Sequence, residues 1–274
     1  MLLSFIVPTK YIKRFGKSSD FTLALSHLIN RDTINDYEKA ILELNIPIWL
    51  DNGAFERGIP DGIDDLFIKA KKINAELIFA PDFFNDKIKT EKALNNYFYV
   101  KERYHPDIKV KTAAIVQADN LTEYLELFES YLNNDKVDVI GINHLTTGRV
   151  IQREGKRYTK KEPFELDKSQ LHLNRIKLLE IIDKKFKLSK PVHLLGLGDS
   201  YEDVIISSQK FPWVISNDSS SCFWNAIKRK KILEDGSVEG GKREEPVDFF
   251  FKRATNDQLL LANYNINKIK SLIN

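Results

Sequence analysis

The feature that most constrains this chain is a short apolar run that ends in an acidic turn. The residues from Ile46 to Leu50 are apolar, with β-branched and aromatic side chains, and Asp51, Asn52 and Gly53 follow at once. A run of this length and composition predicts a buried strand. Polar residues directly after a buried strand are typical of parallel α/β proteins, which carry their chemistry at the carboxyl ends of the strands. Taken alone, Asp51 is equally well explained as a turn cap.

The pattern gains weight because it recurs along the chain. Apolar runs alternate with amphipathic segments of helical length, and most of the runs end in Asp, Asn, Gln or His. The predicted strands are 2–7, 46–50, 75–80, 110–116, 137–142, 191–198 and 213–216, with 247–251 as the eighth. The predicted helices are 18–30, 33–44, 61–74, 85–104, 121–132, 168–186, 201–210 and 257–272, and a hairpin is expected around 234–238.

This alternation predicts an α/β fold, a TIM-type (β/α)8 barrel with an irregular last strand and a hairpin insertion. Strand and helix that alternate throughout give a parallel sheet with right-handed crossovers. Seven or eight such units favour a closed barrel, and an open doubly wound sheet is the alternative. A length of 274 residues suits one barrel, so we expect a single domain over 1–274.

Composition is that of a soluble globular protein, with 42% hydrophobic and 30% charged residues. No apolar run approaches the roughly 20 residues of a membrane span, and the N-terminal residues lack the features of a signal peptide. We therefore expect a cytoplasmic protein with no membrane partner, in the host cytoplasm if the chain is phage-encoded. The single cysteine, Cys222, excludes an internal disulfide and a zinc site built from several thiolates, so neither metal nor cofactor is predicted.

Polar side chains at the ends of the predicted strands should meet at one end of the barrel. Carboxylates placed there can accept hydrogen bonds, act as acid or base, or attack an electrophilic carbon. Several carboxyl groups together raise one another's pKa, so that protonated and ionised forms coexist near neutral pH. The residues are Asp51, Asp82, Gln117, His144, Asp199 and Asp218.

Five of these segments, taken in order, carry a resemblance to a known family. Residues 51–55 (Asp-Asn-Gly-Ala-Phe) resemble the Asp-Ser-Gly-Gly-Phe motif of tRNA-guanine transglycosylases, and 114–117 (Ala-Ile-Val-Gln) resemble their Gly-Ile-Val-Gln strand. Residues 139–142 lie where that family has a glycine-bearing strand, and 194–198 are similar to its Met-Gly-Val-Gly strand. Residues 217–221 (Asn-Asp-Ser-Ser-Ser) occupy the place of its nucleophilic aspartate. The family fold is a TIM barrel.

The chain departs from the tRNA-modifying enzymes in one respect. Those enzymes carry a zinc subdomain with three cysteines and a histidine after the nucleophile, and Cys222 alone cannot form it. The Asp-Ser-Ser-Ser sequence and the compact length look closer to the deazapurine DNA modification proteins (DpdA) of phages and bacteria. The resemblance therefore implies a pentosyltransferase that exchanges guanine in DNA for a 7-deazaguanine base of the preQ0 type.

The resemblance also implies roles for individual residues. Asp218 would attack C1′ of the target nucleoside and Asp51 would shuttle the proton at N9. Asp82 would accept hydrogen bonds from N1–H and the exocyclic amine, Gln117 would donate to O6, and Gly141 would let the backbone approach the base. His144 and Gly198 are further expected substrate-binding residues; His144 lies outside the transferred motifs, and a purely structural role is the commoner one for such a histidine.

A basic segment after the predicted fifth strand suggests where a polynucleotide lies. Residues 146–161 hold six basic residues and one acid, and in a barrel they should emerge at the catalytic end, as should the run 228–231. The predicted phosphate-binding residues are Arg149, Arg153, Lys156, Arg157, Lys160 and Lys161. Three alternatives stay open: the same reaction on tRNA, a TIM-barrel hydrolase of a small glycoside or nucleoside, and a nucleic-acid-binding module without catalysis.

Overall fold

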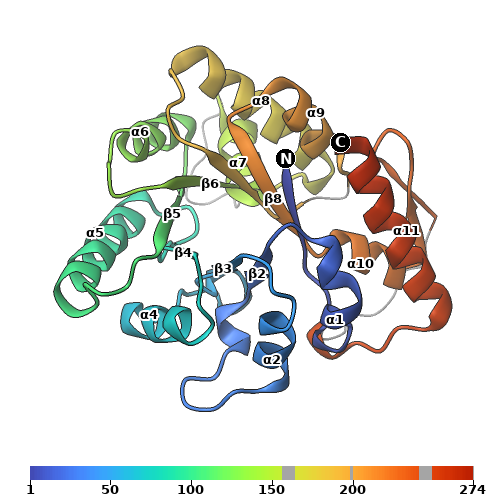
Figure 1. Cartoon of the computed structure of the whole chain (residues 1–274). Coiled ribbons are helices and arrows are strands. Elements are labelled where there is room, and N and C mark those ends of the chain that lie inside the picture. The colour runs from blue at the N-terminus through green and yellow to red at the C-terminus, as the bar shows by residue number, and fades with distance from the viewer. Residues whose placement is uncertain (156–163, 198–199, 241–248, 274) are drawn as a thin grey trace.

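The computed structural model describes residues 1–155, 164–197, 200–240 and 249–273. Within these ranges eight parallel strands form one sheet that curls into a barrel, and helices surround it (Figure 1). The predicted (β/α)8 barrel is confirmed. The strands are β1 (Leu2–Phe5), β2 (Thr22–Ala24), β3 (Ile48–Leu50), β4 (Leu77–Phe79), β5 (Lys111–Ile115), β6 (Val139–Asn143), β7 (Val192–Leu195) and β8 (Val214–Ser219).

The helices form the outer layer, and several of them begin at a residue whose side chain caps the first turn. Asn35 starts a capping box with Glu38, and the side chains of Asp86 and Asn120 accept hydrogen bonds from backbone N–H groups of the first turns of α5 and α6. The helices are α1 (Ile12–Phe15), α2 (Asp36–Leu42), α3 (Ala54–Arg57), α4 (Ile63–Lys72), α5 (Lys87–Tyr104), α6 (Leu121–Leu132), α7 (His144–Arg153), α8 (Leu171–Lys185), α9 (Glu202–Lys210), α10 (Ser221–Ile227) and α11 (Asn256–Ile273). A search of the described helices finds none with the length and hydropathy of a bilayer span.

The first βα unit differs from the prediction. Residues 18–30, expected to form a helix, contain β2 and one short 3-10 turn, Ser26–Leu28. Phe21, Leu23 and Leu25 are all buried at a spacing of two residues, which is the period of a strand. The prediction was wrong because these leucines and the phenylalanine were assigned to a helical face.

The last strand was also misplaced, because the prediction did not count β2. With β2 counted, β8 is the eighth strand of the described barrel, and it ends at Ser219. Residues 247 and 248 lie outside the described part of the chain, and Phe249–Phe251 form a 3-10 turn. The predicted hairpin is confirmed: β9 (Lys230–Ile232) pairs antiparallel with β10 (Val238–Gly240) outside the barrel.

Side chains supply much of the closure between the first and second strands. Every other neighbouring pair in the barrel is joined by a parallel backbone ladder, and in the ladder order of the described strands β1 and β2 stand at the two ends. Ser4 Oγ accepts from the Leu23 N–H at 3.0 Å, and Ser19 Oγ accepts from the Phe5 N–H at 2.9 Å. Asp20 accepts from the Leu3 N–H at 2.8 Å and donates its own N–H to Leu3 O. We call this set of contacts the β1–β2 seam.

The seam predicts a stability cost for a very small substitution. Ser4→Ala removes the acceptor of the buried Leu23 N–H, so the free energy of unfolding should fall by about 1–3 kcal/mol in urea titrations. Ser271→Ala, on the exposed face of α11, is the matched control and should change it by less than about 0.5 kcal/mol. Equal stabilities of the two variants would show that the seam contributes nothing.

Candidate functional site

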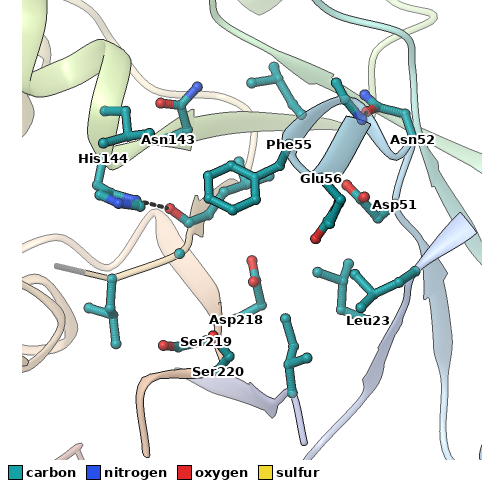
Figure 2. Close-up of a pocket in the computed structure, with 18 of the residues that line it drawn as sticks. Leu23, Asp51, Asn52, Phe55, Glu56, Asn143, His144, Asp218, Ser219 and Ser220 are labelled. Carbon is teal, nitrogen blue, oxygen red and sulfur yellow. Dashed lines mark hydrogen bonds between the residues drawn. The ribbon is translucent and has the colours of Figure 1, made fainter. Parts of the chain in front are cut away.

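A cavity of about 410 Å³ lies at the carboxyl-terminal end of the barrel. Four acidic side chains line it, namely Asp51, Glu56, Asp82 and Asp218, together with Gln117, Asn143 and His144. Figure 2 shows Asp218 and Glu56 pointing toward one another from opposite walls, with Asp51 beside Glu56. Apolar and aromatic residues complete the wall, among them Leu23, Phe55, Phe84, Leu195, Trp224 and Phe250.

The turn after β3 presents Asp51 to the cavity. Asp51 Oδ2 accepts from the Gly53 N–H at 2.8 Å, and Asn52 Oδ1 accepts from the Ala54 N–H at 2.9 Å. Gly53 has a φ of 77°, in the left-handed region that glycine adopts without strain. A Cβ there would also lie 2.7 Å from Ser26 Oγ. The Asp-Asn-Gly sequence therefore fixes this turn, which holds the Asp51 carboxyl and starts α3, the helix that carries Glu56.

Asp82 belongs to a buried chain of side-chain amides. Asn52 donates to Asp82 Oδ1 at 2.7 Å, and Gln117 donates to Asp82 Oδ2 at 2.5 Å. The amide oxygen of Gln117 accepts from the Thr146 hydroxyl at 2.5 Å and from the Asn85 N–H at 3.2 Å. These contacts orient both side chains, so Gln117 turns its amide nitrogen toward Asp82.

Asp218 stands at the end of β8 and is bound from below by a histidine. His193 Nε2 lies 2.9 Å from Asp218 Oδ1, and His193 Nδ1 lies 2.9 Å from the Ser216 hydroxyl. His193 is fully buried inside the barrel, whereas Asp218 retains slight exposure to the cavity.

Burial and mutual repulsion favour the neutral forms of two of the carboxyl groups. Burial raises the pKa of Asp51 well above its usual range, and the Glu56 and Asp218 carboxyls raise it further, against the effect of the Gly53 hydrogen bond. Burial also raises the pKa of Glu56, and the nearby Asp218 carboxyl adds to that rise. The cavity can therefore hold a protonated acid beside an ionised carboxylate, which is the arrangement that acid and nucleophile roles require.

His144 supplies a neutral polar group on the opposite wall. Burial lowers its pKa to about 4, and the Arg175 guanidinium lowers it as well. Its Nδ1 lies 3.3 Å from Leu195 O, and Gly196 leaves room for the ring, since a Cβ there would lie 2.8 Å from it. At neutral pH His144 can therefore act as a hydrogen-bonding group and adds no charge.

Several predicted site residues lie elsewhere. Gly141 is not among the residues found to line the cavity; a Cβ at this position would lie 2.9 Å from Leu195 Cδ1 and 3.0 Å from Ile115 Cγ1, so close packing explains the glycine. Its contact with a base stays a prediction. Gly198 and Asp199 lie outside the described residues.

The basic segment is not the loop that was predicted over 146–161. This holds for its described residues, 146–155, of which those up to Arg153 belong to α7. Both arginines of this helix bind Asp119: Arg149 Nη2 lies 2.6 Å from Asp119 Oδ1, and Arg153 contacts the same oxygen. A phosphate would have to compete with Asp119 for these two side chains. Lys156, Arg157, Lys160 and Lys161 lie outside the described residues.

The sequence reasoning missed three residues of the site. Glu56 directly follows the motif of residues 51–55, five residues after Asp51, and this spacing was a usable signal. Asn52 was treated as part of a turn, although its amide also binds Asp82. His193 lies inside the apolar run 191–198, where a histidine is commonly a core residue, and the inward direction of its ring requires the register of β7 against β8.

In the described ranges no three His, Cys, Asp or Glu side chains form a group suited to a metal ion. No protein-family model matches this chain, and no curated protein matches it. Among solved structures it is similar to an HpcH/Hpal aldolase/citrate lyase family protein from Burkholderia cenocepacia J2315. The TM-score is 0.47 and the sequence identity 8%, over 81% of this chain and 89% of that chain. A likeness at this level carries no argument about a reaction.

The Asp82 carboxyl predicts a specific pH dependence of stability. Burial raises its pKa from 3.8 to about 6 against the hydrogen bonds from Asn52 and Gln117. Its contribution to stability is therefore present below about pH 4 and is lost as the pH rises through 6. The free energy of unfolding of the natural protein relative to Asp82→Asn should fall by about 2 kcal/mol between pH 4 and pH 7, at about 1.4 kcal/mol per pKa unit.

Urea titrations over this pH range measure the difference. The control is Asp36→Asn, because the Asp36 side chain is 95% exposed; its difference from the natural protein should stay nearly level. Parallel pH curves for the natural protein and Asp82→Asn would contradict the elevated pKa.

Proposed function

We propose that this protein is an enzyme, a guanine transglycosylase that exchanges guanine in DNA for a 7-deazaguanine base. One observation carries the proposal: Asp218 and Asp51 share a cavity in which Asp51 favours its protonated form and Asp218 keeps a carboxylate oxygen without a hydrogen-bond partner among the described residues. An acid and a nucleophile on opposite sides of a scissile bond are what base exchange through a covalent intermediate needs.

The proposed reaction has two steps. The Asp218 carboxylate attacks C1′ of the target nucleoside, a bond forms between C1′ and the carboxylate oxygen, and the C1′–N9 bond breaks. The electron pair goes to N9, which takes the proton of Asp51. The incoming base then loses its N9 proton to the Asp51 carboxylate, N9 attacks C1′, and the bond to Asp218 breaks.

The amide chain around Asp82 supports recognition of a guanine edge. Each Asp82 oxygen accepts one amide hydrogen bond and retains a lone pair that can accept from the N1–H or the exocyclic amine of the base. No lysine or arginine lines the cavity in the described part of the chain. The cavity therefore favours a neutral base and leaves the phosphates outside, which requires the target base to flip out of its stack.

DNA is the proposed polynucleotide, and tRNA is the alternative. The choice rests on the resemblance to the DNA-modifying branch and on the single cysteine, which cannot build the zinc subdomain of the tRNA enzymes. Nucleoside mass spectrometry of DNA and tRNA from cells that express the protein distinguishes the two substrates.

The central test is Asp218→Ala in a base-exchange assay with radiolabelled guanine and single-stranded DNA. Loss of the nucleophile should lower the rate by a factor on the order of 10⁴ or more, because the covalent step has no substitute. Asp36→Ala, which changes an exposed aspartate on α2, should keep the natural rate.

Three outcomes would contradict the proposal. Label incorporated by Asp218→Ala at the natural rate would exclude the covalent mechanism. Release of guanine without incorporation of label would indicate a hydrolase. Binding of DNA without either reaction would indicate a binding module.

A second test concerns the choice of base. In Asp82→Asn one of the two side-chain oxygens becomes an amide donor, which faces the donors of guanine and leaves one of them unpaired at a cost of about 1–3 kcal/mol. The preference for guanine over adenine or hypoxanthine in competition assays should therefore fall roughly 5- to 150-fold. An unchanged preference would place base recognition elsewhere in the cavity.

A further inference from the structure

His193 lies in the interior of the barrel, directly beneath Asp218. It comes from β7, and its side chain is fully buried. Three aromatic rings surround it, with centroids 6.0 Å (Phe21), 5.5 Å (Trp49) and 5.2 Å (Phe79) from its own. Packing against these rings leaves the imidazole little freedom to rotate, and their low polarity strengthens the hydrogen bonds that it makes.

Both ring nitrogens of His193 lie within hydrogen-bond distance of a partner, one a carboxylate and the other a hydroxyl. Nε2 lies 2.9 Å from Asp218 Oδ1, and Nδ1 lies 2.9 Å from Ser216 Oγ. An ionised carboxylate only accepts hydrogen bonds, whereas a hydroxyl can donate or accept. In the neutral ring, the proton therefore lies on Nε2, and Nδ1 accepts from the Ser216 hydroxyl.

We propose that His193 is a positioning residue that holds the Asp218 carboxylate for attack, with Ser216 fixing its tautomer. This inference rests on the proposed role of Asp218 as the nucleophile. The donated hydrogen bond occupies Oδ1 and stops the carboxylate from rotating, so Oδ2 is the oxygen directed to C1′. The hydrogen bond from His193 does this from beneath the carboxylate, away from the cavity, and a misplacement of about 1 Å at such a centre costs on the order of 10²-fold in rate.

Purely apolar packing would not require this arrangement. A core histidine that serves only to fill space needs partners for its nitrogens, but it does not need a cavity-facing carboxylate as one of them. Phe21 and Leu23 already show that this part of the barrel is filled by apolar side chains. The pair of contacts to β8 at Ser216 and Asp218 places His193 under the reacting group instead.

Two substitutions of similar size test the hydrogen bonds of the two ring nitrogens separately. In His193→Gln the side-chain amide can reach the place of Nε2 and still donate to Asp218. In His193→Asn the shorter amide reaches only the place of Nδ1, so it contacts Ser216 and leaves Asp218 without its donor. The readouts are kcat and KM for base exchange on single-stranded DNA, and the single-turnover rate of formation of the covalent protein–DNA adduct, trapped by denaturation.

We expect kcat and the adduct rate of His193→Asn to fall by roughly 10- to 100-fold with KM within about twofold, and His193→Gln to recover most of the loss. Urea unfolding of both variants gives their stability. Should His193→Asn fail to fold, Ser216→Ala serves instead, since it keeps both His193 and Asp218 and removes the contact that fixes the tautomer; its kcat should fall by less, with KM unchanged. Natural kcat in His193→Asn or in a folded Ser216→Ala, or equal losses in the Gln and Asn variants, would overturn the proposal.

A readout that is independent of activity separates this proposal from the proposed function. ¹⁵N NMR of histidine-labelled protein should show His193 as the Nε2–H tautomer, with a resonance that shifts in Asp218→Ala. A natural protein that shows this signal and exchanges no base would overturn the proposed function and with it the positioning role, while the contact itself would stand. A His193 resonance that is unchanged in Asp218→Ala would overturn the contact, whatever the activity.

Discussion

The site depends on the cost of placing several carboxyl groups in one cavity without a lysine or arginine among the described residues that line it. Three of the four acids accept hydrogen bonds from groups other than lysine or arginine: Asp51 from a backbone N–H, Asp82 from two side-chain amides, and Asp218 from an imidazole. Neutral donors orient a carboxylate but leave most of the repulsion between neighbouring charges in place. Burial and this repulsion together raise the pKa values of Asp51 and Glu56, which shifts both carboxyl groups toward their protonated forms.

Three cationic side chains near the cavity bind carboxylates that do not line it. Arg57 and Lys69 both bind Asp61, which lies beneath the turn that carries Asp51. On the other side, the fully buried Arg175 binds Asp203 at 2.6 Å and donates to the carbonyl oxygens of Leu195 and Gly196. These ion pairs hold the three cationic side chains against carboxylates that do not line the cavity. The separation explains how a chain with a positive net charge presents an acidic cavity.

Periodicity and strand-end chemistry made the barrel and most of the acidic cluster predictable. Asp51, Asp82 and Asp218 follow apolar runs, and parallel strands bring their ends together whatever the details of packing. Two kinds of feature were not predictable in this way. Strand β2 is three residues long, too short for period two to stand out against period 3.6 at Phe21, Leu23 and Leu25. The contact of His193 with Asp218 depends on which strand lies beside β7 and in which register, and both are properties of the closed barrel.

The β1–β2 seam has a consequence for the order in which the barrel can form. Strand β1 is the first to be synthesised, yet its backbone ladder is made with β8, whose residues Ser216 to Ser219 pair with Leu2 to Phe5. It must therefore wait for almost the whole barrel before it gains that ladder, while on its other side much of the join to β2 is made by side chains. Contacts so distant in sequence are slow to form. The same pairing brings Asp218 beside Ser4, so the Asp218 carboxylate gains this neighbour only when β1 joins β8.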